Sequence, residues 1–152
     1  MLKINLITVG NLKDKFFIEA CEEYSKRLTR FCNLKITELK EYTNLENVEQ
    51  IKNAEGEEIL KAVRGYVILM DVNGTLISSE QLADKIERIS LNGGDVSFVI
   101  GGSYGVSEKV KQRANELISM SKMTFPHRLF RVMLLEQIYR AFTINNNIKY
   151  HK

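Results

Sequence analysis

The sequence contains few of the residues that mark specialised protein classes. Of its 152 residues, 2 are cysteine, 1 is proline and 9 are glycine, which excludes a disulfide framework, a collagen-like repeat and a low-complexity chain. No apolar run reaches the roughly 18 residues of a membrane-spanning helix, and the run at 4–9 is too short for a signal peptide. We therefore expect one globular domain over residues 1–152, cytoplasmic and without a membrane partner.

Residues that commonly bind metals are also scarce. Cys21, Cys32, His127 and His151 are the only cysteines and histidines, and they match no metal-ligand spacing. We expect reduced, buried thiols and no bound metal. No Ser-His-Asp or Cys-His arrangement with a nucleophile elbow is present either, so nothing in the sequence supports hydrolase chemistry.

Charge is distributed unevenly along the chain, although the net charge is only +3. The segment 38–58 holds seven acidic and two basic residues, whereas 122–152 holds six basic residues and one acidic residue. Lysine and arginine supply most of the non-specific affinity of proteins for nucleic acid. The C-terminal part is therefore suited to RNA phosphates, with an ordinary solvated surface as the alternative.

Hydrophobic periodicity predicts an alternation of strands and helices. The unbroken apolar runs at 66–70 and 96–100 are typical of parallel strands that are covered on both faces. Polar caps at Asn44 and Ser78 mark two helix starts. We predict strands at 3–9, 34–39, 66–70, 96–100 and 122–125, and helices at 14–29, 44–63, 78–92, 107–117 and 127–143. This order predicts an α/β fold with helices on a mainly parallel sheet.

The last predicted helix is apolar around most of its circumference, which requires burial on more than one side. We therefore expect it to form a subunit interface in a homodimer as well as to cover the sheet.

The segment FVIGGSYG at 98–105 is the sharpest local feature. A buried strand ends directly at two glycines, which is typical of ligand loops in open α/β sheets and equally of a plain tight turn. Its glycine spacing matches neither a dinucleotide fingerprint nor a P-loop. Two other predicted strands end at 70–71 and 123–127, so we expect three loops to converge at one edge of the sheet.

Four segments together resemble the RlmH family, the ribosomal RNA large subunit methyltransferase H group of the SPOUT superfamily. They are INLITVGNLKDKFF, FVIGGSYGVSEKV, SMSKMTFPHRLFRVMLLEQIYRAFTI and the terminal YHK. The likeness covers essentially the whole chain. It implies a SPOUT-type knotted fold with a deep trefoil knot near the C-terminus, whereas chain-threading rules alone favour a flavodoxin-like sheet.

The resemblance also implies an activity. Members of the RlmH family are S-adenosylmethionine-dependent homodimers that methylate N3 of pseudouridine 1915 in 23S rRNA of the assembled 70S ribosome. Matched position by position, the cofactor-binding residues are Met70, Gly101, Met120, Ser121, Lys122, Met123, Thr124 and Phe125. Met70 stands where members often have leucine, which keeps an apolar wall. The catalytic candidates are His151, Arg140 and Tyr150, and which of them is the base stays open.

Two other functions remain open at this stage. One is a knotted methyltransferase that acts on tRNA. The other is a non-catalytic S-adenosylmethionine-binding factor that associates with ribosomes. At the level of the fold, the alternative is a flavodoxin-like nucleotide module.

Overall fold

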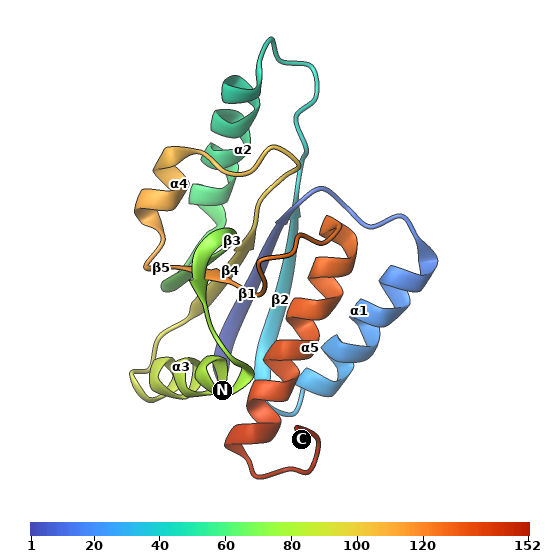
Figure 1. Ribbon diagram of the computed structural model, residues 1–152, viewed down its shortest axis with the longest axis vertical. Helices are drawn as coiled ribbons and strands as arrows, with labels where there is room; N and C mark the ends of the chain where they lie inside the picture. The colour runs from blue at the N-terminus through green and yellow to red at the C-terminus, as the bar shows by residue number, and fades with distance from the viewer.

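The computed structural model describes all 152 residues and consists of a five-stranded sheet with helices on both faces (Figure 1). The strands are β1 (Leu2–Val9), β2 (Cys32–Leu39), β3 (Tyr66–Leu76), β4 (Val96–Ile100) and β5 (Glu116–Ser119). The helices are α1 (Lys15–Leu28), α2 (Val48–Ala62), α3 (Ser79–Leu91), α4 (Glu108–Arg113) and α5 (His127–Asn145). The strand order is β2-β1-β4-β3-β5 and every pairing is parallel, which confirms the predicted α/β fold.

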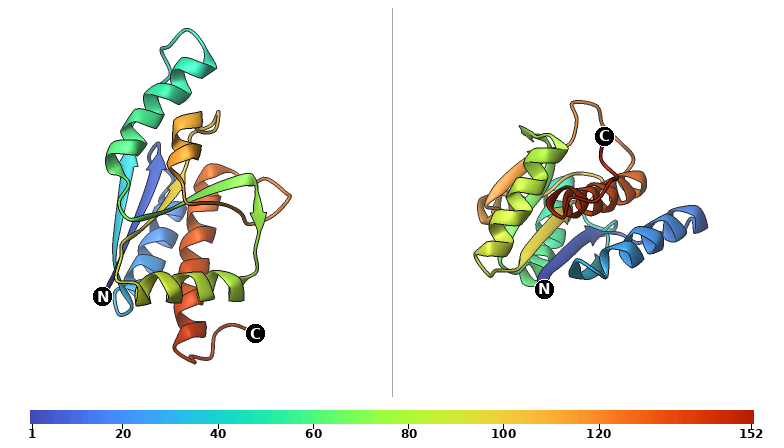
Figure 2. Two further views of the ribbon diagram at one scale, coloured as in Figure 1. Left: turned by 90° about the vertical axis from the view of Figure 1, so that its left-hand side faces the viewer. Right: turned by 90° about the horizontal axis from the view of Figure 1, so that it is seen from below.

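Two separate cores lie on the two faces of the sheet (Figure 2). All five residues of β4 are buried, and successive side chains point to opposite faces. Phe98 therefore belongs to the larger core with Ile86 of α3 and Leu135 of α5, while Val99 belongs to the smaller core with Ile59 of α2. The continuous apolar run thus identifies a strand covered on both sides, as predicted.

Helix α5 contacts α1 on one side and α3 on the other. Its buried apolar residues are Leu134, Leu135, Ile138, Ala141 and Phe142. The burial that its apolar circumference requires is therefore largely met within one chain. A subunit interface on this helix stays a prediction.

The segment before α5 differs from the sequence prediction. Leu117, at helical spacing from Val110, was expected in a helix, and 122–125 in the last strand. Instead α4 ends at Arg113 and β5 covers Glu116–Ser119. The reason is that Asn115 is hydrogen-bonded to β3. The Asn115 backbone donates to the Val67 carbonyl and its side chain accepts from the Val67 backbone, both at 2.8 Å. These bonds start a strand where the periodicity predicted a helix.

Helix α2 begins later than predicted. Asn47, and not Asn44, is the N-cap, and its side chain accepts a hydrogen bond of 2.8 Å from the Gln50 backbone. The predicted capping box at the start of α3 is confirmed, because Ser78 and Gln81 each accept from the other's backbone. The Ser78 cap is supported by a glutamine three residues later, a signal that Asn44 lacks.

Strand β3 continues beyond the predicted end at Met70. It pairs with β5 in two stretches, with a shift of register between Met70 and Thr75. The Asn73-Gly74 pair, expected as a turn, lies within this irregular stretch. A Cβ on Gly74 would be 2.6 Å from the Leu117 carbonyl carbon, so only glycine allows the two backbones to approach here.

Both cysteines are buried and neither forms a disulfide, as predicted. Burial raises the pKa of the Cys32 thiol to about 11, so this thiol is protonated at neutral pH. No cluster of three or more histidine, cysteine, aspartate or glutamate side chains is placed to hold a metal ion. None of the helices is long and apolar enough to cross a membrane. The segment 120–126 links β5 at the sheet edge to α5. The trefoil knot expected near the C-terminus stays a prediction.

Candidate functional site

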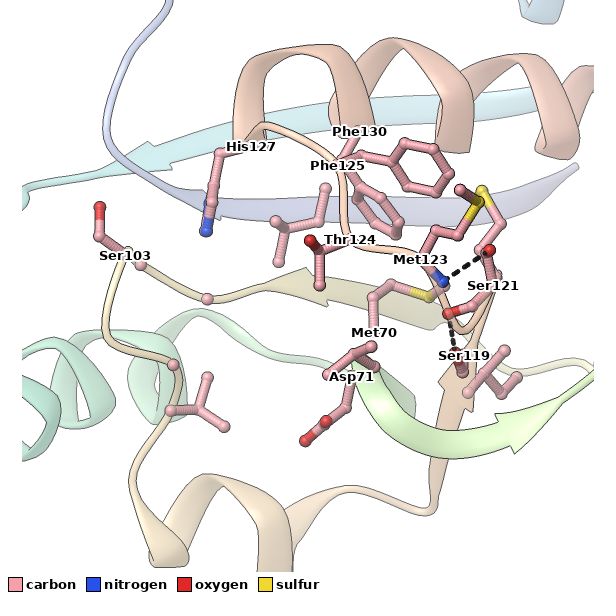
Figure 3. Close-up of a pocket in the computed structure, with 18 residues that line it drawn as sticks. Met70, Asp71, Ser103, Ser119, Ser121, Met123, Thr124, Phe125, His127 and Phe130 are labelled. Carbon is pink, nitrogen blue, oxygen red and sulfur yellow. Dashed lines mark hydrogen bonds between the residues drawn. The ribbon is translucent and has the colours of Figure 1, made fainter.

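A cavity of about 390 Å³, called here the strand-end pocket, lies at the carboxyl ends of β4 and β5, beside the irregular middle of β3 (Figure 3). Its walls come from residues 70–72 within β3, the glycine loop after β4, the segment 118–127 and Phe130 of α5. The three predicted segments therefore do meet, although residues 70–72 belong to a strand and not to a loop. Parallel strands place their carboxyl ends at one edge, which explains the convergence.

Most of the predicted cofactor-binding residues line this pocket. They are Met70, Gly101, Met120, Ser121, Met123, Thr124 and Phe125. Lys122 is the exception, because it is exposed and does not contribute to the wall. The structure thus gathers these residues in one place, although their role as ligand contacts is not shown by this placement.

The glycine loop is both a tight turn and a wall of the pocket. Gly105 has a φ of +88° and its backbone donates to the Gly102 carbonyl at 3.0 Å. A Cβ on Gly101 would be 2.5 Å from Val106 Cγ1, and one on Gly102 would be 2.5 Å from Glu55 Oε1. A Cβ at Gly101 would overlap a stiff valine methyl group, whereas one at Gly102 would require the Glu55 carboxylate to move.

Short hydrogen bonds fix the opposite wall of the pocket. Ser119 Oγ donates to the Ser121 carbonyl at 2.8 Å, and the Met123 backbone donates to Ser121 Oγ at 3.0 Å. Apolar side chains complete the wall, among them Met70 and Phe125. Concave sites with an apolar lining and a few fixed polar groups are typical of sites for aromatic ligands.

His127 lines the pocket but was not among the predicted site residues. Figure 3 shows it near Ser103, at the end of the pocket away from Ser119 and Ser121. Although His127 as a residue is exposed, protein atoms around its imidazole desolvate the ring, which lowers its pKa. The Arg131 charge lowers this pKa further and the Glu41 charge opposes it. The ring is therefore neutral at pH 7, and its position in the T-F-P-H segment was the signal that could have identified it.

Three arginines of the cationic C-terminal region are already engaged within the chain. Arg128 pairs with Asp14 at 3.0 Å, Arg131 pairs with Glu38 at 2.5 Å, and Arg140 pairs with a glutamate on its own helix. Lysines 122, 149 and 152 form no ion pair. Arg131 and Arg140 are therefore less available to RNA phosphates than the composition predicts, whereas Arg128, whose pair with Asp14 is exposed, can exchange its partner.

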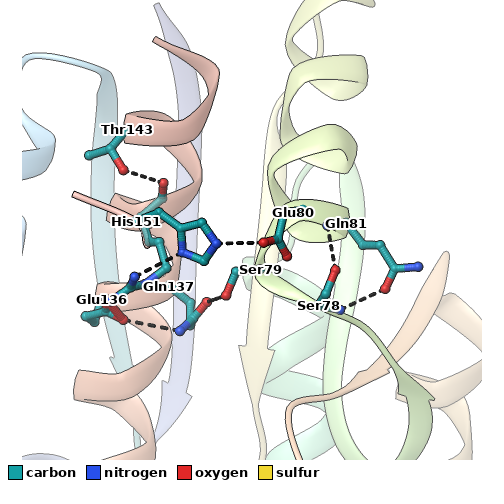
Figure 4. A network of polar contacts seen from close by, with 9 residues as sticks. Ser78, Ser79, Glu80, Gln81, Glu136, Gln137, Thr143 and His151 are labelled. Carbon is teal, nitrogen blue, oxygen red and sulfur yellow. Dashed lines mark hydrogen bonds and ion pairs between the residues drawn. The ribbon is translucent and has the colours of Figure 1, made fainter. Parts of the chain in front are cut away.

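The three catalytic candidates form one polar network at the far end of α5. Figure 4 shows one part of it, in which His151 points toward Glu80 of α3. Arg140 Nη1 lies 3.1 Å from His151 Nδ1, and His151 Nε2 lies 2.6 Å from Glu80 Oε1. Arg140 Nε donates to Glu136 Oε1 at 2.8 Å, and the Tyr150 hydroxyl donates to the same oxygen at 3.2 Å. The network therefore joins the C-terminal tail to α5 and to α3.

The partners define the protonation of this network. Arginine can only donate, so His151 Nδ1 accepts from Arg140, and Nε2 carries the proton that it donates to Glu80. The hydrogen bond with His151 in turn lowers the pKa of the Glu80 carboxyl. Burial raises the pKa of Tyr150 to about 12, so its hydroxyl stays protonated at neutral pH. Both ring nitrogens of His151 are occupied in this arrangement.

The network is remote from the strand-end pocket within one chain. His127 at the pocket and Arg140 in the network are 13 positions apart on α5, which corresponds to about 20 Å along the helix axis. Figure 1 shows the C-terminus at the opposite end of α5 from the segment that enters it. The structure therefore assembles two groups of predicted site residues, but does not bring them together.

Comparison with known proteins gives consistent matches. The family model described as "Predicted SPOUT methyltransferase" matches residues 2–151. The chain is 48% identical to the ribosomal RNA large subunit methyltransferase H of Caldicellulosiruptor saccharolyticus, over 98% of this chain and 99% of that protein. It is also 48% identical to the protein of the same name from Clostridium botulinum (strain Alaska E43 / Type E3), over 99% of this chain and 100% of the relative.

A solved structure supports the fold. A probable methylase family protein from Haemophilus influenzae Rd KW20 superposes with a TM-score of 0.54 at 15% identity, over 95% of this chain and 66% of that protein. At this identity the likeness supports the fold alone. With the family match and the two relatives, it follows that this chain belongs to the SPOUT methyltransferase family, in the ribosomal RNA large subunit methyltransferase H group.

Proposed function

We propose that this protein transfers the methyl group of S-adenosylmethionine to N3 of pseudouridine 1915 in 23S rRNA of the assembled 70S ribosome. The observation that carries the proposal is the strand-end pocket, whose walls contain seven residues that match the cofactor contacts of the family. The names of the full-length relatives support the ribosomal RNA substrate.

The residues of the strand-end pocket fit the methyl donor. Met70, Met120 and Phe125 form apolar walls suited to an adenine ring, and the glycine loop presents backbone at close range. S-adenosylmethionine supplies an activated methyl group on a sulfonium sulfur. Gly101 and the pocket-lining residues of the 120–125 segment would hold the nucleoside. Positioning of this kind can supply a large part of the rate enhancement of a group transfer.

The chain's own catalytic task is to make N3 nucleophilic by removing its imide proton. His151 removes this proton, and the Arg140 guanidinium stabilises the resulting anion. Tyr150, whose pKa is too high for a base, donates a hydrogen bond. In this tautomer only Nδ1 of His151 can accept the proton, so its contact with Arg140 must be broken first, and we propose that binding of RNA breaks it.

The distance between pocket and network leads us to propose a homodimer in which one subunit's tail completes the other's pocket. Each subunit is a single SPOUT methyltransferase domain over 1–152, with a deep trefoil knot near the C-terminus. The dimer acts in the cytoplasm, where its ribosomal partner is found. Exposed apolar side chains near the pocket, Met123 at 75% and Leu129 at 38%, are available for the second subunit.

The direct test is methyl incorporation from labelled S-adenosylmethionine into purified 70S ribosomes, 50S subunits and bulk tRNA, all from cells that lack the protein. Label confined to 23S rRNA of 70S particles is expected. Label in tRNA would replace this proposal with the tRNA methyltransferase. Binding to ribosomes without incorporation, at saturating donor, would replace it with the non-catalytic factor.

A further inference from the structure

A second cavity of about 160 Å³, called here the polar cavity, adjoins the strand-end pocket and shares Ile100, Ser103 and His127 with it. It lies between the end of β1, the segment after β2, the glycine loop and the start of α5. Its polar lining includes Thr8, Asn11, Glu41 and Arg128. The polar cavity is therefore a direct neighbour of the strand-end pocket, with Ser103 and His127 on the boundary between them.

Thr8 is an unusual part of this wall. Its side chain is 2% exposed, and its hydroxyl has no hydrogen-bond partner. Buried hydroxyl groups in folded proteins nearly always have a partner, because an unpaired one loses its bonds to water without compensation. The polar cavity is the space from which a ligand group can provide the missing bond.

The polar cavity also carries charges of both signs. The Glu41 carboxylate forms no ion pair, and its one hydrogen bond is a long contact of 3.3 Å from the Ser103 hydroxyl. Arg128 provides the positive charge, because its pair with Asp14 is exposed and such pairs contribute little stability. Arg131 is already engaged by Glu38 and by the Gly10 carbonyl. One open carboxylate and one available guanidinium thus face the same small space.

We propose that the polar cavity binds the α-amino acid end of S-adenosylmethionine, with Glu41 on the ammonium group and Arg128 with the neutral His127 on the carboxylate. The inference rests on the proposed donor site in the strand-end pocket. A free phosphate fits less well, because Glu41 would repel it. Anchoring both ends of the donor orients the sulfonium between them, so these are positioning residues.

The test compares two ligands by isothermal titration calorimetry. S-adenosylhomocysteine carries the amino acid end, whereas methylthioadenosine has the same nucleoside and sulfur without it. Because charge-assisted hydrogen bonds are strong, Glu41→Gln should weaken binding of S-adenosylhomocysteine about 10-fold and leave methylthioadenosine unchanged. Glu46→Gln, an exposed change in the same segment, should leave both affinities unchanged.

Thr8→Val gives a second, nearly isosteric test. It should weaken S-adenosylhomocysteine alone, while the ligand-free protein melts at the same or a higher temperature because an unpaired hydroxyl is removed. Equal losses for both ligands, or no loss for either, would overturn the inference. If the wild-type chain binds neither nucleoside, the donor site itself is wrong. If Glu41→Gln lowers methylation of ribosomes but not donor affinity, the polar cavity serves RNA instead.

Discussion

Gly102 is one of two positions in the glycine loop, with Gly101, at which an added Cβ would overlap a neighbouring side chain. A Cβ there would be 2.5 Å from Glu55 Oε1 and 3.2 Å from Val9 Cγ1, and both of these side chains are buried. We expect Gly102→Ala to lower the free energy of unfolding by about 1–3 kcal/mol through overpacking. It should also weaken binding of S-adenosylhomocysteine, because the loop must shift.

Gly94→Ala is the matched control for Gly102→Ala. No atom lies within 4 Å of a Cβ built at Gly94, and its φ is not positive. Urea denaturation of the two variants should therefore differ by at least ~1 kcal/mol. Equal stabilities would show that the loop is free to move away from Glu55.

Glu55 makes the stability of the folded chain depend on pH. Desolvation by burial is the main cause that raises the pKa of its carboxyl above the usual 4.5, the nearby Glu41 charge adds to it, and the hydrogen bond from the Tyr42 backbone opposes it. The folded chain thus favours the protonated form. The contribution of Glu55 to the free energy of unfolding is fully present below the unfolded-state pKa, and it is lost as the pH rises through the folded-state pKa.

Glu55→Gln mimics the protonated carboxyl at every pH. The melting temperature of this variant relative to the wild type should increase as the pH is raised from about 4 to 7, and level off above the folded-state pKa. Differential scanning calorimetry across this range measures the change. A difference that stays constant with pH would mean that Glu55 titrates as it does in the unfolded chain.

At the scale of elements, one ion pair fastens α5 to β2 and to the loop after β1. Arg131 has only 8% of its side chain exposed, whereas its partner Glu38 has 40% exposed. Glu38 also accepts from the Leu12 backbone at 3.2 Å. Removal of the glutamate leaves a buried, unpaired guanidinium, but removal of the arginine leaves a carboxylate that water can reach.

Substitution of Glu38 and substitution of Arg131 should therefore lower the free energy of unfolding by different amounts. Glu38→Ala should lower the free energy of unfolding by about 3–5 kcal/mol, and Arg131→Met by clearly less, because methionine fills the space. Glu23→Ala, which breaks an exposed pair with Arg27 on α1, should leave the free energy of unfolding nearly unchanged. Equilibrium unfolding in urea checks the order, and an equal cost for the first two would contradict the burial argument.

The accuracy of sequence-based prediction also varied by element. Strand β4 could be recognised because five consecutive apolar residues are buried on both faces. Strand β5 could not, because Leu117 falls at helical spacing and the decisive contact, Asn115 with Val67, joins positions 48 apart in the chain. The convergence of loops at the strand ends followed from the parallel order alone. The polar cavity did not, because Thr8, Glu41 and Arg128 come from distant segments.

At the scale of the whole molecule, one chain keeps two groups of predicted site residues apart, namely those of the strand-end pocket and those of the C-terminal network. Pattern and resemblance together identified both the pocket residues and the tail residues, but no sequence feature could place them about 20 Å from each other. Only the packed arrangement of α5 does so. We therefore propose that the catalytic unit is a dimer, with the pocket from one subunit and the tail from its partner.

A mixing experiment tests this claim most directly. His151→Ala removes the base and leaves the pocket, while Thr124→Trp fills the pocket from an exposed position and leaves the tail. Each variant alone should be inactive in methyl transfer to 70S ribosomes. After subunit exchange, half of the dimers are mixed and each has one intact site, so about one quarter of wild-type activity should return. If the mixture stays inactive although calorimetry or mass spectrometry confirms the exchange, the tail does not act on its partner's pocket.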